Sequence, residues 1–157
     1  MGHLYRALNL ADALKKAGYN CKFYLNNHLQ SCNILEKTNY PYATVELSDH
    51  KSNWEKAIID KDQVKVWIND RLDTDSRHTN KIKSNNIPLV TFDDQGDGAK
   101  LADLHIAALM FDKITALQGK RILHGIEYLI LNPQIEHYRR LRDRVKSILV
   151  TLGGSDT

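Results

Sequence analysis

Apolar residues recur every three or four positions at the start of the chain, and this spacing predicts an amphipathic helix from residue 4 to residue 17. Such spacing gathers side chains on one face of a helix. Gly18 follows where a helix commonly ends in a left-handed residue. The residues of the stripe are Leu4, Ala7, Leu8, Ala11, Leu14 and Ala17. The chain therefore begins with a helix and has no strand in front of it.

Short apolar runs, typical of buried strands, follow this helix. Helical patterns at residues 30–37 and 75–86 separate some of these runs. Strands that alternate with helices favour a parallel sheet covered on both faces, so we expect a Rossmann-like α/β fold. The five predicted strands cover residues 21–25, 42–47, 64–68, 88–92 and 104–109.

The last part of the chain, from residue 133, differs from the preceding part in its charge and in its predicted elements. Residues 133–144 are rich in charge and predict a long helix, and residues 145–152 predict an apolar strand that runs into a glycine turn. We therefore expect a first domain over residues 1–132, a linker helix over 133–146 and the beginning of a second domain at 147–157. Both ends of the sequence resemble interrupted βα units.

Composition narrows the class of protein. The 157 residues are 42% apolar and 26% charged with a formal charge of +3, which is ordinary for a soluble domain. The cations of residues 139–146 are interrupted by aspartate and lack interleaved aromatic residues, which favours a solvated helix face over a nucleic-acid surface. No run approaches the roughly 18 apolar residues of a membrane span. Cys21 and Cys32 have neither disulfide-framework nor zinc-site spacing, which favours a reducing cytoplasm.

The first candidate site is the start of the N-terminal helix. In parallel sheets, ligands bind beyond the carboxyl ends of the strands, where the following helices begin. Gly2 permits close approach of a ligand to the backbone, His3 suits proton transfer near neutral pH, and Arg6 lies one turn further on. The alternative is that His3 merely caps the helix and that Arg6 is solvated.

Aspartates follow two of the predicted strands. Asp70 comes just after the strand 64–68, where it could bind a sugar hydroxyl or orient a base, or where Asp73, Thr74 or Asp75 could simply cap the next helix. Asp93 and Asp94 follow the strand 88–92. Adjacent carboxylates could share a proton or bind a metal. A sugar contact or a structural turn is favoured over a metal, because no histidine or third acid completes a ligand set.

Gly153, Gly154 and Ser155 follow the last predicted strand and form a plausible phosphate cradle of backbone N–H groups and a hydroxyl. The stretch is neither a P-loop nor a dinucleotide-binding glycine motif. Alone, it is a weak signal, because Gly-Gly turns are common.

Taken in order, these motifs resemble one family. The stretches "GHLYRALNLADAL", "IND", "FDD", "GIEYLILNP" and "VTLGGSDT" are similar to those of the UDP-sugar hydrolases of pseudaminic-acid synthesis and the related spore-coat polysaccharide proteins of the glycosyltransferase-B superfamily. The resemblance spans almost the whole chain. It implies two Rossmann-like domains with an active cleft between them, of which this chain is the N-terminal, acceptor-side part.

The resemblance also implies roles for single residues. His3 corresponds to the histidine that activates the attacking water, Asp70 to the acid after the central strand, and Asp93 and Asp94 to an acidic pair. Gly2, Arg6 and Tyr128 fall in motifs on the substrate side. The diphosphate of the UDP-sugar would lie near Gly153, Gly154, Ser155 and Asp156. The resemblance implies no metal or other cofactor, and the chain alone is expected to be inactive.

One departure from the family keeps other functions open. The hydrolases carry a tyrosine two residues after the acid, and this chain has Leu72 there. A hydrolase or transferase that acts on another sugar nucleotide is therefore a further possibility. A second, different class is a non-catalytic α/β module that binds a sugar or phosphate, or docks beside a fused polysaccharide-biosynthesis enzyme.

The family's first strand is missing in front of Gly2. Its absence would leave unpaired N–H and C=O groups in the middle of the sheet. We expect either that further residues precede Met1, or that residues 145–152 fill the gap or pair with a second molecule in a strand-exchanged dimer.

Overall fold

A computed structural model describes residues 2–108, 117–140, 143–144 and 147–148 of the chain. The described part begins with helix α1 (Gly2–Lys16) and alternates strands with helices from there to β5. The remaining elements are β1 (Phe23–Leu25), α2 (Leu29–Glu36), β2 (Tyr42–Thr44), α3 (Trp54–Asp62), β3 (Trp67–Asn69), α4 (Ser76–Ser84), β4 (Leu89–Phe92), the 3-10 helix η1 (Ala99–Leu101), β5 (Leu104–Ala107), β6 (Ile122–His124), the 3-10 helix η3 (Ile126–Tyr128) and α5 (Ile135–Tyr138).

The strands form two parallel sheets. Strand β1 pairs with β2, and a second sheet has the order β3-β4-β5-β6. In the second sheet Trp67 is in register with Leu89, and Val90 with Leu104. The expected α/β class with parallel pairing and flanking helices is confirmed, and the strands form two separate sheets.

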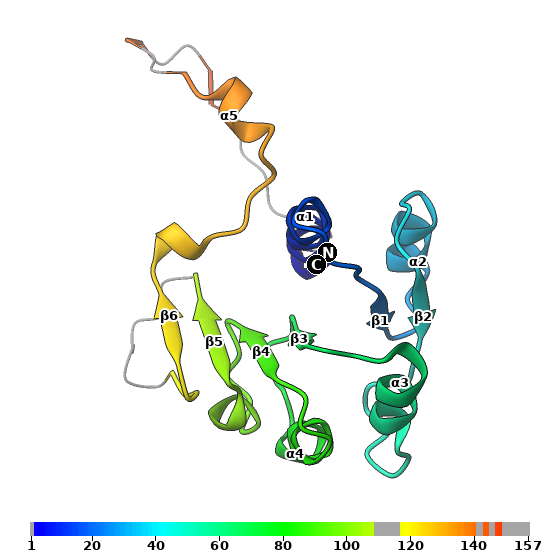
Figure 1. The fold of residues 1–157 in the computed structure, drawn as a ribbon. Coiled ribbons are helices and arrows are strands. Elements are labelled where there is room, and N and C mark those ends of the chain that lie inside the picture. The colour runs from blue at the N-terminus through cyan, green and yellow to red at the C-terminus, as the bar shows by residue number, and fades with distance from the viewer. Residues whose placement is uncertain (1, 109–116, 141–142, 145–146, 149–157) are drawn as a thin grey trace.

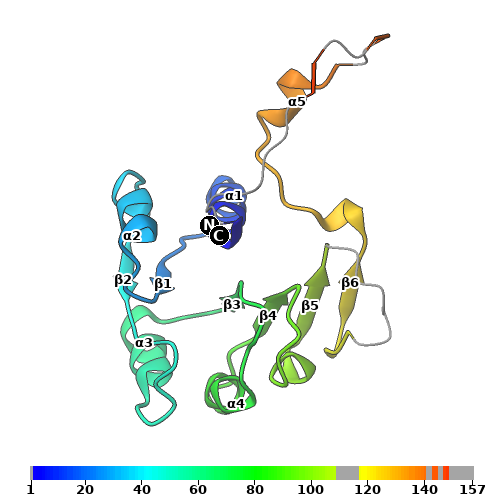
Figure 2. The ribbon, with the colours of Figure 1, turned by 180° about the vertical axis from the view of Figure 1, so that it is seen from behind.

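Helix α1 contacts residues next to both sheets. Arg6, near its start, contacts Asp70 just after β3, while Asp12, near its end, accepts a hydrogen bond from Tyr40 just before β2. Strand β3 therefore ends where α1 begins, and β2 begins where α1 ends, so both strands run opposite to α1. Figures 1 and 2 show α1 between the sheets on one face, with α3 and α4 on the other face.

The core lies between the second sheet and its two helices. Ile58 and Ile59 of α3 and Ile82 of α4 pack against Trp67 and Leu89, with Ala102 beside them. Tyr24 of β1 and Val45 pack at the margin of this cluster. Because the apolar side chains of both sheets meet around α3, the hydrophobic effect holds the two sheets in one folded unit.

Several predicted elements differ in length from those observed. The strand expected at 64–68 is observed at Trp67–Asn69, and the strand expected at 104–109 is observed at Leu104–Ala107. Helix α3 and strand β6 had no counterpart among the predictions. Register with the neighbouring strand, which the hydropathy of a single segment does not contain, sets where each strand starts.

The prediction of a long helix over 133–144 was wrong. Helix α5 spans only Ile135–Tyr138, and Arg139 and Arg140 are not helical. Every described residue from 131 to 148 is exposed, so the described part of this segment buries no apolar face. Short helices without tertiary packing are marginal in water. The predicted strand 145–152 and the Gly153–Asp156 turn lie outside the described residues, apart from Ser147 and Ile148.

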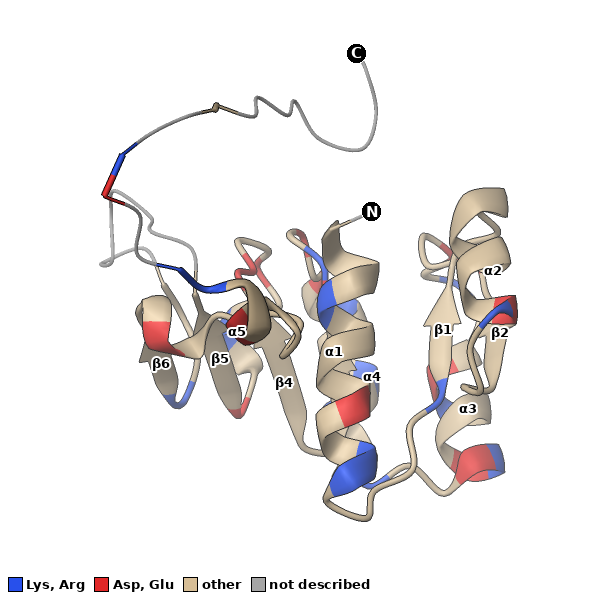
Figure 3. Cartoon of the chain, turned by 90° about the horizontal axis from the view of Figure 1, so that it is seen from above, with Lys and Arg blue, Asp and Glu red and all other residues tan. Residues whose placement is uncertain are grey.

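Acidic and basic residues are interspersed over the described elements (Figure 3). In the cation-rich stretch 139–146, expected to be solvated, the described charged residues Arg139, Arg140, Asp143 and Arg144 are exposed. No helix in the described ranges combines the length and the hydropathy that crossing a bilayer requires.

Candidate functional site

The start of α1 meets the carboxyl ends of β3 and β4, and side chains from all three elements converge there. His3 and Arg6 come from the first turns of α1, Asp70 follows β3, and Asp93 follows β4. Neighbouring parallel strands deliver their carboxyl ends to one edge, which is why residues so distant in sequence meet.

Arg6 lies between two carboxylates. Its Nε donates to Oδ2 of Asp70 at 2.9 Å and its Nη2 donates to the other Asp70 oxygen, which makes the pair bidentate. Its Nη1 donates to Asp93. The guanidinium also lies over the ring of Phe92, 5.2 Å from the ring centre. The planar guanidinium matches this arrangement in a way that a lysine could not.

The environment holds Arg6 firmly charged. The hydrogen bond to Asp70 is the largest cause that raises the pKa of Arg6 above its usual value, burial opposes it, and Asp93 adds to the rise. The guanidinium of Arg6 therefore forms ion pairs with Asp70 and Asp93 of the same chain. Arg6 was predicted to bind substrate, and in the structure its bidentate contact also fixes the position of Asp70.

His3 contacts the same aspartate. Its Nδ1 lies 2.6 Å from Oδ1 of Asp70, and its side chain keeps 45% of its surface exposed. When Nδ1 carries the proton and donates it to Asp70, Nε2 is the acceptor nitrogen of the ring. A half-exposed histidine oriented by a fixed carboxylate has the arrangement of a general base.

Asp93 and Asp94 are adjacent but face different surroundings. Asp93 is fully buried, has φ of +49°, and directs its carboxylate to Arg6. A positive φ costs less for aspartate than for most residues. Asp94 accepts hydrogen bonds from the backbone N–H groups of Thr74 and Gly96 through Oδ1. Asp94 therefore fixes the turn between β4 and η1.

The acidic residues in and near the loop after β3 also have distinct roles. Asp75 is the residue that caps α4, through a hydrogen bond from the backbone N–H of Arg77. Asp97 adds to this helix start by accepting bonds from the N–H and the hydroxyl of Ser76. Asp75 and Asp97 thus supply the hydrogen bonds at the start of α4. Asp70 takes no part in this cap, and its carboxylate contacts His3 and Arg6 of α1.

The other predicted site residues lie elsewhere or outside the described part. Tyr128 ends η3 after β6, at the opposite edge of the sheet from β3. A Cβ at Gly2 would meet no atom within 4 Å, so the backbone there is open. Gly153, Gly154, Ser155 and Asp156 lie outside the described residues.

An open depression of about 340 Å³ lies next to Asp94. Asp97, Lys100 and Gln118 are among its lining residues, and the His3 ring is not. Within the described ranges, no group of three or more His, Cys, Asp or Glu side chains is arranged to hold a metal ion.

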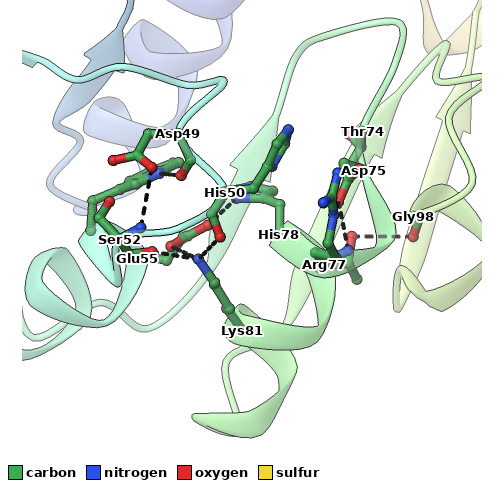
Figure 4. Close-up of polar contacts among 12 residues, drawn as sticks. Asp49, His50, Ser52, Glu55, Thr74, Asp75, Arg77, His78, Lys81 and Gly98 are labelled. Carbon is green, nitrogen blue, oxygen red and sulfur yellow. Dashed lines mark hydrogen bonds and ion pairs between the residues drawn. The ribbon is translucent and has the colours of Figure 1, made fainter.

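A second histidine–carboxylate contact was not anticipated from the sequence. It lies between α3 and α4, where His78 Nδ1 is 3.1 Å from Glu55 Oε1 and both residues are buried (Figure 4). Lys81 lies 3.4 Å from the other Glu55 oxygen, and it also donates to the carbonyl groups of His50 and Ser52. This contact joins the two helices to the loop before α3.

The other side of the His78 ring completes a buried network. His78 Nε2 is 3.4 Å from Oδ1 of Asn69, which also accepts from the indole N–H of Trp67 at 2.9 Å. The ring of Trp54 stacks on His78, 5.2 Å between centres. Burial lowers the pKa of His78, and Glu55 opposes this shift. One signal was present in the sequence: Glu55 shares a helix face with Ile58 and Ile59.

Comparisons with known proteins give no family assignment. A scan against protein-family models finds no match, and searches of curated proteins and of solved structures find none either.

Proposed function

We propose that this chain is the acceptor-side part of a nucleotide-sugar hydrolase or glycosyltransferase of cell-surface polysaccharide synthesis, with His3 as the general base. The observation that carries the proposal is the contact of 2.6 Å between His3 Nδ1 and Asp70 Oδ1 at the carboxyl edge of the sheet. The motif resemblance described above supplies the substrate class, a UDP-sugar.

In the proposed reaction, His3 Nε2 takes a proton from water or from an acceptor hydroxyl. The oxygen of that nucleophile forms a bond to the anomeric carbon, and the bond from that carbon to the phosphate oxygen breaks. The electron pair of this bond leaves with UDP. Asp70 stabilises the imidazolium that forms, because its carboxylate is held in place by Arg6.

The test is UDP release from a panel of UDP-sugars, measured on a protein that contains this chain together with the nucleotide-binding domain that the resemblance implies. We expect His3→Ala to lower kcat by about 100-fold or more, the usual contribution of a general base. Tyr5→Ala is the matched control, because Tyr5 is an exposed neighbour on the same helix. An unchanged kcat in His3→Ala contradicts the proposal.

A non-catalytic binding module is the second candidate, and Leu72 favours it. This side chain is exposed two residues after Asp70, where the hydrolases of the resembled family carry a tyrosine. For a module, the resonances of His3 and Asp70 would shift when UDP-N-acetylglucosamine is added, while no UDP is released. Release that depends on His3 excludes this candidate.

A further inference from the structure

His105 of β5 is a fully buried histidine that does not touch the candidate site but lies next to one of its loops. It is in register with Thr91 of β4. Its ring Nε2 accepts a hydrogen bond of 3.2 Å from the backbone N–H of Asp94, and its Nδ1 lies 2.7 Å from the carbonyl oxygen of Gln118. Both ring nitrogens therefore contact main-chain groups, one in the loop after β4 and one in the loop before β6.

These two partners determine which nitrogen of the His105 ring carries the proton. A backbone N–H can only donate a hydrogen bond, and a backbone carbonyl can only accept one. Nε2 must therefore present its lone pair to Asp94, while Nδ1 must donate its proton to Gln118. A proton on Nε2 would face the N–H of the buried Asp94 and remove its acceptor, which is costly inside a protein. The neutral ring with its proton on Nδ1 satisfies both contacts.

The hydrogen bond from Asp94 to His105 also constrains Asp93, the residue before it. Asp93 donates its own N–H to the carbonyl oxygen of Ile106 at 2.9 Å, so the peptide groups on both sides of its Cα are bonded to β5. Because peptide groups are planar, fixing these two groups fixes φ and ψ of Asp93. The resulting φ of +49° is uncommon outside glycine and persists where the surrounding contacts hold it.

The backbone conformation of Asp93 sets the direction of its carboxylate. This carboxylate is fully buried and forms an ion pair with Arg6. Arg6 in turn makes the bidentate contact with Asp70, whose carboxylate lies beside His3. A change in φ at Asp93 would therefore be transmitted to the candidate site through Arg6.

We propose that His105 is a positioning residue for the candidate site. The hydrogen bond that it accepts from Asp94 holds Asp93 in the conformation that brings its carboxylate to the guanidinium of α1. The consequence for catalysis rests on the proposed function. The consequence for the conformation of Asp93 does not, and it is tested without any substrate.

The first test uses the wild-type chain of 157 residues and needs no variant. Long-range ¹H–¹⁵N NMR spectra show which nitrogen of the His105 ring carries the proton. A scalar coupling across the hydrogen bond connects the backbone nitrogen of Asp94 to Nε2 when that bond is formed. We expect the proton on Nδ1 and a measurable coupling. A proton on Nε2, or the absence of the coupling, overturns the proposal.

The second test compares two variants at His105. His105→Leu removes the acceptor, whereas His105→Gln places an amide oxygen where it can accept the same bond. In His105→Leu we expect the backbone chemical shifts of Asp93, which report φ, to leave the left-handed range. The Nε–H of Arg6 should exchange with solvent about 10-fold faster, because the guanidinium loses a carboxylate partner. His105→Gln should keep both properties close to those of the wild type, a rescue that a role in packing alone does not predict.

Thr91→Val is the matched control for these variants. Thr91 is in register with His105 and equally buried, and its hydroxyl has no hydrogen-bond partner in the described part of the chain. This variant should leave the chemical shifts of Asp93 and the exchange of Arg6 unchanged. Unchanged amide signals of β3 and α4 show that each variant is folded.

This proposal and the proposed function can fail separately. If Asp93 stays left-handed in a folded His105→Leu, the positioning role is overturned. In the UDP-release assay described above, His105→Leu should lower kcat about 10-fold and change KM little, as expected for a misplaced general base. If Asp93 and Arg6 respond as expected while UDP release depends on neither His3 nor His105, the positioning role is supported and the proposed function fails.

Discussion

The described part of the chain contains two contacts between a histidine and a carboxylate, and their surroundings differ. His3 and Asp70 meet at the edge of the sheet, where the ring keeps 45% of its surface exposed. His78 and Glu55 meet inside, between α3, α4 and β3, under the ring of Trp54. An imidazole and a carboxylate are therefore placed to exchange protons with solvent in one region and to hold elements together in the other. Exposure, more than the identity of the residues, separates the two roles.

The largest loss of stability is expected when the buried contact between His78 and Glu55 is removed. His78→Ala removes the stacking on Trp54 and leaves Glu55 buried without its histidine. We expect the free energy of unfolding to fall by about 3 kcal/mol or more, measured by denaturant unfolding. Arg77→Ala, at the exposed neighbouring position, should change it little, and an equally small effect of His78→Ala would contradict a structural role.

The next effect is expected at Arg6, the cation that holds Asp70. Arg6→Ala removes the guanidinium that pairs with the buried carboxylate of Asp93 and with Asp70, so we expect a loss of about 2 kcal/mol in the free energy of unfolding. Arg6→Lys should recover part of the stability but not the bidentate geometry. Crystal structures or NMR spectra of both variants should show His3 displaced from Asp70, and an undisturbed contact would argue against the positioning role.

The buried His78 should also make the stability of the protein depend on pH. Because burial lowers the pKa of His78 below its usual value near 6.5, the unfolded chain binds the proton more readily than the folded chain does. The contribution of His78 is therefore fully present above pH 6.5 and declines as the pH falls below it. The difference in unfolding free energy between wild type and His78→Gln, measured from pH 5 to 8, should show this decline, and a flat difference would contradict it.

The smallest effect on stability is expected at His3 itself. His3→Ala removes one half-exposed hydrogen bond, so we expect less than about 1 kcal/mol by thermal or denaturant unfolding. The proposed activity should nevertheless be lost. A large loss of stability in this variant would instead class His3 with His78 as a structural residue.

The sequence predicted the fold class and named His3, Arg6, Asp70 and Asp93 as candidate residues in loops next to strand ends, because both rest on where residues fall relative to strands and helices. It did not predict that Arg6 pairs with Asp70 and Asp93. It did not distinguish Asp93 from Asp94, since only the positive φ of Asp93 sends the first carboxylate to Arg6 and leaves the second for the turn. The Glu55–His78 contact forms only because α3 packs on α4. The sequence of neither helix alone predicts that packing.

Strand β6 was not predicted, and the helix over residues 133–144 was predicted but is not observed. Strand β6 is only half-buried and lies between Arg121 and Gly125, so its pattern was too weak to stand out. Residues 133–144 had a strong helical pattern, but the described residues find no apolar surface to pack on and form a single turn, Ile135–Tyr138. Local propensity decides an element only where tertiary contacts agree with it.

Helix α1 is held by hydrogen bonds near both ends, from Arg6 to Asp70 after β3 and from Tyr40, two residues before β2, to Asp12. A helix of 15 residues is a stiff rod of about 22 Å at 1.5 Å per residue. A rotation of roughly 5° about its far end moves the first turn by about 2 Å, which is comparable to the length of the hydrogen bond from His3 to Asp70. If the first sheet shifted relative to the second, the stiffness of α1 would therefore change the distance between His3 and Asp70.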